Sequence, residues 1–129
     1  SKTMIVNIGL DLIETARIQR AWERFGLKFA GKILTPEELA HIPKNPIPFL
    51  AARFAGKEAG VKALGTGFSQ GITFHSLTIH SDQSGKPSLS FSGRALQQAA
   101  ELKVTRTHLS LTHARDTACA VVILEKASE

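Results

Sequence analysis

The chain has 129 residues, of which 43% are hydrophobic and 21% charged, and its excess of Lys and Arg over Asp and Glu gives a net charge of +5. This length is that of one ordinary domain, and the composition excludes a disordered chain or a membrane protein. No repeat or linker divides the sequence, so we expect residues 1–129 to form one domain. The positive charge favours an anionic partner: a nucleic acid, a phosphorylated small molecule or an acidic protein.

Two further features concern cellular location. The single Cys119 cannot form an internal disulfide, which agrees with a reducing cytoplasm. The first residues lack the pattern of a secretory signal peptide, and no stretch reaches the roughly 18 apolar residues of a membrane span. We therefore expect a soluble, cytoplasmic protein.

The first predicted element is a strand over residues 4–11. Apolar residues alternate along it, which predicts that one face is half-buried. The residues expected on that buried face are Met4, Val6, Ile8 and Leu10. Asp11 lies on the opposite face, beside Gly9.

A helix is predicted next, over residues 14–25, because apolar and basic residues each recur at helical spacing. The apolar stripe, which we expect to face the core, comprises Ile18, Trp22 and Phe25. The basic stripe comprises Arg17, Arg20 and Arg24. Gly26 can end this helix.

Two helix starts follow. Thr35 can cap a short helix in which Glu38 closes a capping box, and Asn45-Pro46 can begin a long helix that ends at a Gly65 cap. The positions of the long helix that are spaced for burial are Leu50, Phe54, Val61 and Leu64. Glu58 and Lys62 are four residues apart, so they project from one face of this helix.

The second half of the chain has the pattern of strands. Strands are predicted over residues 72–75, 77–80 and 89–91, with a turn over residues 82–87. A helix is expected over residues 93–103, and residues 107–113 and 118–125 are expected to form a hairpin. This order predicts an α+β fold with a largely antiparallel sheet, one long helix and several shorter helices.

Two local patterns carry the functional information. The sequence has no phosphate-binding loop, nucleophile elbow or common zinc motif. It does have Gly9-Leu10-Asp11-Leu12-Ile13-Glu14 followed by Arg17-Ile18, and Arg53-Phe54-Ala55-Gly56-Lys57-Glu58-Ala59 followed by Lys62-Ala63-Leu64-Gly65. Together these segments resemble the signatures of the bacterial holo-acyl-carrier-protein synthases, which are small phosphopantetheinyl transferases. The resemblance continues through Gly65-Thr66-Gly67, Gly85-Lys86-Pro87 and Leu109-Ser110-Leu111-Thr112-His113.

The resemblance implies a 4′-phosphopantetheinyl transferase-like fold and a Mg²⁺-dependent transfer from coenzyme A to a serine of an apo acyl carrier protein. This reaction releases adenosine 3′,5′-bisphosphate and serves fatty acid biosynthesis. Asp11 and Glu58 match the metal ligands, which agrees with the preference of Mg²⁺ for carboxylate oxygens combined with substrate phosphates and water. Glu58 is also a candidate to accept the serine proton.

The resemblance also implies roles for residues outside the metal site. Lys62 would steady the leaving phosphate, and the residues expected to contact coenzyme A are Lys62, Gly65, Lys86 and His113. Arg17, which belongs to the first signature, and Arg24 are expected to bind the acidic carrier protein. The family forms homotrimers with a site between adjacent subunits, and neither nucleic acid nor a membrane is expected as a partner.

The sequence leaves two alternative functions open and departs from the family pattern at two positions. A nucleic-acid-binding domain would explain the charge, although the sequence has no Tyr and a single Trp22 for base stacking. A Mg²⁺-dependent phosphohydrolase could use the same Asp11 and Glu58. The sequence departs from the family pattern at Asn7 and Thr117, where glycine and an aromatic residue are common. The remaining histidines, expected at the surface, are His41, His75, His80 and His108.

Overall fold

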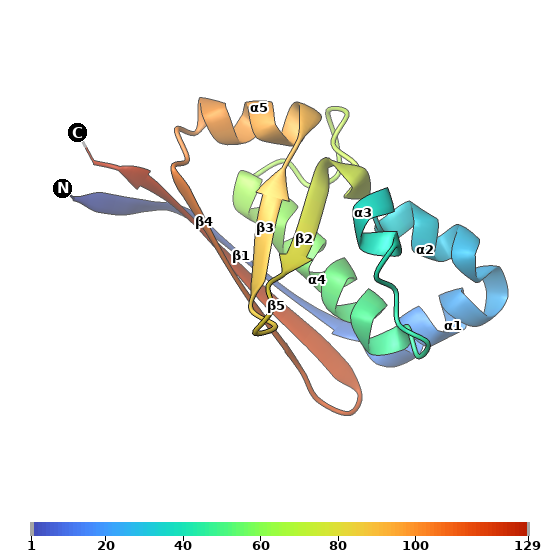
Figure 1. Ribbon diagram of the computed structural model, residues 1–129. Coiled ribbons are helices and arrows are strands. Elements are labelled where there is room, and N and C mark those ends of the chain that lie inside the picture. Colours follow the sequence, from blue (N-terminus) through green and yellow to red (C-terminus); the bar gives the residue numbers. More distant parts are fainter. Residues whose placement is uncertain (1, 129) are drawn as a thin grey trace.

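Helix α4 (Ile47–Leu64) runs through the centre of the molecule between two antiparallel sheets (Figure 1). The computed structural model describes residues 2–128. On one side of α4 lies a three-stranded sheet in the order β1–β5–β4, and on the other side lies the hairpin β2–β3. The strands are β1 (Thr3–Glu14), β2 (Leu77–Ser81), β3 (Pro87–Phe91), β4 (Arg106–His113) and β5 (Thr117–Ala127).

Shorter helices surround this centre. On one side of α4 lie three helices together: α1 (Thr15–Phe25), α2 (Leu27–Ile33) and α3 (Pro36–Leu39) (Figure 1). Helix α5 (Gly93–Glu101) lies beyond the end of the hairpin at which β3 finishes (Figure 1). A 3₁₀ turn, η1 (Phe74–Ser76), precedes β2. The expected α+β fold with a largely antiparallel sheet is therefore confirmed. Among residues 2–128, no helix has both the length and the hydrophobicity needed to cross a membrane.

Glycines allow both sheets to lie unusually near α4. A Cβ on Gly9 of β1 would collide with the Ala59 carbonyl oxygen and lie 2.8 Å from the Ala63 nitrogen. On the other side, a Cβ on Gly60 would lie 2.7 Å from a Leu77 methyl group. Backbone therefore meets backbone between β1 and α4, and α4 presents a glycine to the larger side chains of the hairpin.

Several predicted local features are confirmed. Thr35 and Glu38 form the capping box that begins α3. Gly65 caps α4 in the left-handed region with φ of 81°, a conformation that costs glycine no Cβ clash. The four positions of α4 predicted to be buried are all buried.

The predicted buried face of β1 is wrong except at Val6, which is partly buried against the core. Met4, Ile8 and Leu10 are 48%, 58% and 60% exposed, whereas Gly9 and Ile13 are buried. The reason is that the face of β1 that carries Gly9 contacts α4, so Ile8 and Leu10 on the opposite face turn outward. They leave an apolar face on the three-stranded sheet that nothing among residues 2–128 covers.

Three smaller predictions also fail. Phe25 is 51% exposed rather than part of the core stripe, because α1 ends there and the chain turns into α2. Helix α2 was not expected. Residues 72–75 form the entry to η1 instead of a strand, since Thr73 caps this turn through the His75 amide.

Candidate active site

Two carboxylates from distant parts of the chain meet where β1 crosses α4. Asp11 follows Gly9 by two residues and therefore lies on the same face of β1, toward the helix. Glu58 and Lys62 come from successive turns of α4, and the Lys62 Nζ lies 3.0 Å from Asp11 Oδ1 and 3.1 Å from the Leu10 carbonyl oxygen. The structure thus brings together the three residues that the sequence assigned to catalysis.

The electrostatics of this cluster favour a bound cation. Burial raises the pKa of the Glu58 carboxyl, the neighbouring charge of Asp11 raises this pKa further, and Lys62 and Arg17 oppose the shift. The two carboxylates therefore repel one another, and the charges of Lys62 and Arg17 oppose that repulsion. Lys62 neutralises Asp11 but leaves half of its own side chain exposed to solvent.

The donor set fits a magnesium ion that shares its coordination with a substrate. Across residues 2–128, no three His, Cys, Asp or Glu side chains form a group able to hold a metal ion. Mg²⁺ is commonly held by one or two carboxylates plus phosphate oxygens and waters. Asp11 and Glu58 could supply the protein's part of such a shell.

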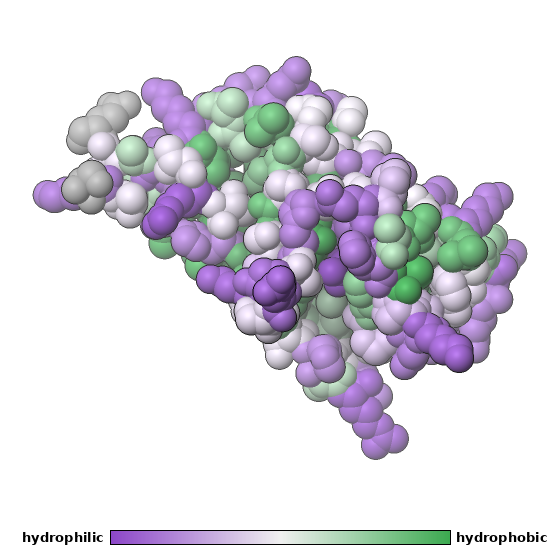
Figure 2. All heavy atoms as spheres, viewed as in Figure 1, coloured by the Kyte–Doolittle hydropathy of each residue, from purple (hydrophilic) through white to green (hydrophobic). Residues whose placement is uncertain are grey.

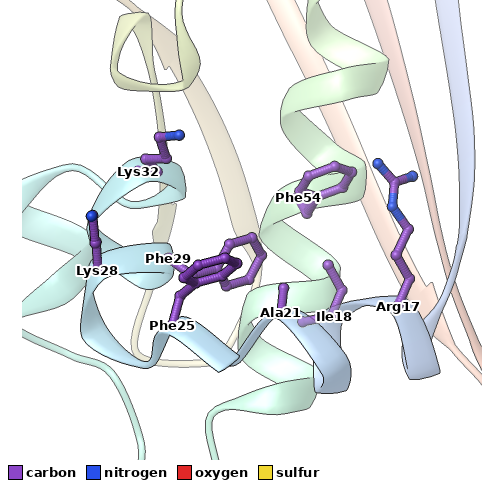
Figure 3. A pocket seen from close by; sticks show the side chains of 8 residues that line it. All are labelled: Arg17, Ile18, Ala21, Phe25, Lys28, Phe29, Lys32 and Phe54. Atoms are coloured by element: carbon purple, nitrogen blue, oxygen red, sulfur yellow. The ribbon is translucent and has the colours of Figure 1, made fainter. Parts of the chain in front are cut away.

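A groove with an apolar floor and a basic rim opens beside this cluster, between α1, α2 and α4. Its volume is about 390 Å³. Figure 3 shows Arg17 beside Phe54 at one end, Lys28 and Lys32 at the other, and the rings of Phe25 and Phe29 between them. The Arg17 guanidinium carbon lies 5.3 Å from the Phe54 ring centroid. We name this feature the α1–α2 groove.

Sequence reasoning found only one end of the α1–α2 groove. Arg17 lines the groove and also acts on Glu58, whereas Arg24 lies at the end of α1 with its guanidinium carbon 5.2 Å from the Phe25 ring centroid. Lys28, Phe29 and Lys32 were missed because α2 was not predicted. On the space-filling surface, hydrophobic side chains gather among hydrophilic ones over α1 to α3 (Figure 2).

The other residues predicted to contact coenzyme A lie in different parts of the structure. Gly65 caps the same end of α4 that carries Lys62, and its N–H donates to the Lys62 carbonyl oxygen at 3.0 Å. His113 ends β4 and lines a pocket of about 60 Å³ with Arg115. In register, Ala118 of β5 stands between His113 and Ile13, so β5 separates His113 from β1. Lys86 precedes β3, which contacts β4.

A second charged cluster lies on another face of α4, and its role was not predicted. Lys57 is fully buried, and its Nζ donates to Glu38 Oε1 at 2.6 Å, to the Ile33 carbonyl oxygen at 2.6 Å and to the Phe74 carbonyl oxygen at 3.1 Å. The other oxygen of Glu38 accepts the Ile79 N–H at 2.9 Å. Arg53 stacks on the Phe49 ring with 3.6 Å from its guanidinium carbon to the ring centroid, and its Nε lies 3.9 Å from Glu38.

The other histidines lie at the surface, as expected. His41, His75, His80 and His108 are all exposed. Three of them have polar partners: His75 contacts the Gly31 carbonyl oxygen, His80 contacts Glu37 and His108 contacts Glu125. None of them approaches a second ligand-type side chain to form a metal-binding group among residues 2–128.

Comparisons with known proteins agree with this geometry. Residues 7–122 match the family model of the 4′-phosphopantetheinyl transferase superfamily. The holo-[acyl-carrier-protein] synthase of Maridesulfovibrio salexigens is 55% identical over 124 residues, which cover 95% of this chain and 100% of that protein. Two crystal structures of holo-acyl-carrier-protein synthases are also similar. That from Neisseria meningitidis has a TM-score of 0.86 and 42% identity over 95% of this chain and 100% of its own. That from Bacillus anthracis, in complex with CoA (3′,5′-ADP), has a TM-score of 0.80 and 35% identity over 96% of this chain and 99% of its own.

These matches span nearly the whole chain, and they fit the meeting of the two signature segments at one site. They favour a transferase over the nucleic-acid-binding domain and the phosphohydrolase that composition and the two carboxylates alone had left open. The chain therefore belongs to the 4′-phosphopantetheinyl transferase superfamily, and within it to the holo-[acyl-carrier-protein] synthases.

Proposed function

We propose that this chain transfers 4′-phosphopantetheine from coenzyme A to a serine of an apo acyl carrier protein and releases adenosine 3′,5′-bisphosphate. The observation that carries the proposal is the meeting of Asp11, Glu58 and Lys62 where β1 crosses α4. Relatives at about half identity bear the name of this activity. A similar structure holds CoA (3′,5′-ADP).

Asp11 and Glu58 would hold the Mg²⁺ on which the reaction depends. The raised pKa of Glu58 and the proximity of Asp11 support this assignment, because a divalent cation relieves the repulsion between two carboxylates. When bound, Mg²⁺ supplies charge neutralisation at the oxygens of the pyrophosphate. The glycine contact between β1 and α4 fixes the spacing of the two ligands.

The protein residues then have separate tasks in the transfer. The serine hydroxyl attacks the β-phosphorus of coenzyme A, a new P–O bond forms, and the bond from that phosphorus to the bridging oxygen breaks. Glu58 takes the serine proton, directly or through a water molecule. Half of the Lys62 side chain is exposed, so its ammonium would be free to stabilise the departing phosphate.

The α1–α2 groove is the proposed site for the carrier protein. Arg17, Lys28 and Lys32 give it a basic rim around an apolar floor, which complements an acidic amphipathic helix. Its Arg17 end lies beside Glu58, so a serine at the end of such a helix reaches the carboxylate. Arg24 lies next to the groove at Phe25 and adds attraction at longer range.

We further propose a homotrimer in which a neighbouring copy completes the coenzyme site. Ile8, Leu10 and Leu12 project from β1 at 58% to 66% exposure, beside Val121 and Ile123 in register on β5. An apolar sheet face of this kind favours association with another copy. Such an assembly would let Lys86 and His113 of a neighbouring copy reach coenzyme A, although both lie away from Asp11 within one chain.

The wider setting follows from the same activity. Residues 1–129 would form one transferase domain, since the family match spans residues 7–122 and α4 contacts both sheets. A carrier protein of fatty acid biosynthesis would be its substrate, in the cytoplasm. The free Cys119 agrees with that reducing compartment.

One experiment tests the proposed function. The chain is incubated with coenzyme A, Mg²⁺ and an apo acyl carrier protein, and the carrier is examined by mass spectrometry for the added phosphopantetheine. We expect complete conversion, which a chelator abolishes. No mass gain with a carrier that another transferase can modify would refute the proposal, and release of inorganic phosphate without a carrier would point to a hydrolase instead.

A further inference from the structure

Among residues 2–128, the most deeply buried charged side chain is that of Lys57, the residue immediately before Glu58. All three protons of its ammonium have acceptors: one carboxylate oxygen of Glu38 and the carbonyl oxygens of Ile33 and Phe74. An ammonium so enclosed cannot reach a substrate. The function of the Lys57 ammonium therefore lies in the segments that it joins.

Two of those segments form the walls of a second hollow beside the α1–α2 groove. Ile33 is the last residue of α2, and Phe74 is the first residue of η1. Between α2 and η1 lies a hollow of about 900 Å³ that shares Lys28, Phe29 and Lys32 with the α1–α2 groove. Lys57 thus holds the inner side of α2, whose outer side carries the basic rim.

Helix α2 depends on such an anchor more than a longer helix would. It has only seven residues, and no side chain caps its N-terminus. The last carbonyl groups of any helix lack partners within the helix and carry partial negative charge. The Lys57 ammonium supplies both a donor and a positive charge at that end.

We propose that Lys57, paired with Glu38, is a positioning residue that fixes the carrier-binding surface of α2 relative to Glu58. The proposal rests on the proposed function, because it assigns the carrier protein to the α1–α2 groove. Lys57 and Glu58 are successive residues of one rigid helix. A bond from Lys57 to α2 therefore sets where a carrier docked on Lys28 and Lys32 presents its serine to Glu58.

The pairing with Glu38 extends the same constraint to the rest of the fold. Glu38 accepts N–H groups from Thr35 and Ile79 in addition to the Lys57 ammonium. Helices α2, α3 and α4 and strand β2 are thereby joined at one buried point. Because a misplacement of about 1 Å can slow a reaction by roughly a hundredfold, such a junction has direct kinetic consequences.

The test uses the double variant Lys57→Met/Glu38→Gln, which removes the charges of Lys57 and Glu38 together and keeps Arg53. The matched control is Leu124→Ala, a truncation of a fully buried side chain on β5, remote from α2. For each folded protein, KM for the apo carrier, KM for coenzyme A and the melting temperature are measured. We expect the double variant to raise KM for the carrier by roughly tenfold and leave KM for coenzyme A within about twofold. The control should lower the melting temperature alone.

A second pair of variants keeps the proposal testable if the double variant does not fold. His75 of η1 lies at the surface, and its Nε2 is 2.6 Å from the Gly31 carbonyl oxygen of α2, so it forms a second link between the same two walls. His75→Ala should raise KM for the carrier by roughly threefold, and His75→Gln, which keeps a donor, should restore it. Direct carrier binding, followed by fluorescence anisotropy, should change in parallel.

Two results would overturn the proposal. One is a double variant with a lower melting temperature but unchanged KM values, which would make Lys57 a structural residue only. The other is an equal rise in both KM values, which would remove the specific link to the carrier. A wild-type protein that transfers no phosphopantetheine in the same assay would instead refute the proposed function, and carrier binding by the His75 variants would still report on the two walls.

Discussion

Helix α4 carries two clusters of acidic and basic side chains whose environments differ completely. In the interior cluster, Lys57 and Glu38 are wholly buried and every proton of the ammonium has an acceptor. In the cluster at β1, Glu58 is partly exposed, and Asp11 shares a single lysine partner with the Leu10 carbonyl oxygen. Burial with complete pairing of the Lys57 ammonium holds the fold together, whereas proximity with incomplete pairing suits the metal and substrate proposed for the cluster at β1.

The two residues at the centre of this contrast, Lys57 and Glu58, are neighbours in sequence. Successive helical residues point about 100° apart, so a helix between two sheets can give adjacent side chains entirely different surroundings. Neutral substitutions in each cluster in turn should therefore help to separate effects on stability from effects on turnover.

The largest expected effect is the loss of turnover in Glu58→Gln. The amide can neither hold Mg²⁺ well nor accept the serine proton, so we expect kcat/KM to fall by at least about a thousandfold. Folding should be retained because the side chain is only half-buried. Steady-state kinetics and thermal melting check this, with Glu101→Gln on the surface of α5 as the control. Near-normal turnover would remove Glu58 from the mechanism.

A large loss of stability is the main effect expected for Lys57→Met. Removing one member of a buried ion pair leaves the Glu38 carboxylate without its main partner, at a cost of about 3 to 5 kcal/mol in the free energy of unfolding. Denaturant titration measures this change. A loss below about 1 kcal/mol, the range typical of exposed ion pairs, would erase the distinction between the two clusters.

A smaller effect on both stability and turnover is expected for Gly9→Ala. The new methyl group would collide with the Ala59 carbonyl oxygen, so β1 must shift away from α4. Overpacking of this kind costs about 1 to 3 kcal/mol. The shift also moves Asp11 from Glu58, and the Mg²⁺ concentration needed for half-maximal activity should rise. Gly31→Ala, where a Cβ meets no atom within 4 Å, is the control.

Arg17→Ala tests how far the cluster at β1 extends into the α1–α2 groove. Loss of this rim charge should raise KM for the carrier by roughly fivefold to tenfold and leave KM for coenzyme A nearly unchanged. The effect should shrink as salt is raised, since exposed charges are screened. Arg106→Ala, on β4, provides an equal change in net charge elsewhere. Equal losses for both substrates would contradict the assignment of Arg17 to the carrier.

The smallest effect concerns pH and the metal-free protein. The pKa of the Glu58 carboxyl is raised in the folded state, so the folded state binds the carboxyl proton more tightly than the unfolded state does. As the pH rises from the unfolded pKa to the folded pKa, deprotonation of Glu58 therefore lowers the free energy of unfolding. Glu58→Gln should therefore melt slightly higher than the wild type at neutral pH without Mg²⁺, and the difference should vanish in acid. In the wild type, kcat/KM should fall as the pH drops through the raised pKa, and more Mg²⁺ should move that fall to lower pH.

The sequence predicted the elements well where a local signal was strong. The capping box at Thr35, the left-handed Gly65 and the apolar spacing of α4 each depend on a few neighbouring residues, and all three are present. Helix α2 escaped prediction because it is short and lacks a side-chain cap. The exposed face of β1 was assigned wrongly because alternation shows two faces but not which one meets the helix.

The candidate site was likewise predicted only in part from the sequence. Resemblance to the synthase signatures picked out Asp11 and Glu58, and the structure places them together with Lys62. The resemblance could not indicate that Lys57 is buried, because its partner Glu38 lies 19 residues earlier and its other acceptors are backbone carbonyl oxygens. The roles proposed for Lys86 and His113 depend on a neighbouring copy, which no pattern within one chain describes.

The pairing of β1 with β5 also has a consequence for how the protein is made. Residues 3–14 align with residues 117–127, so β1 gains its only strand partner among residues 2–128 from a segment far later in the chain. Contacts so distant in sequence slow folding, because a long loop must close before they form. During translation, β1 would stay without its strand partner until β5 has emerged.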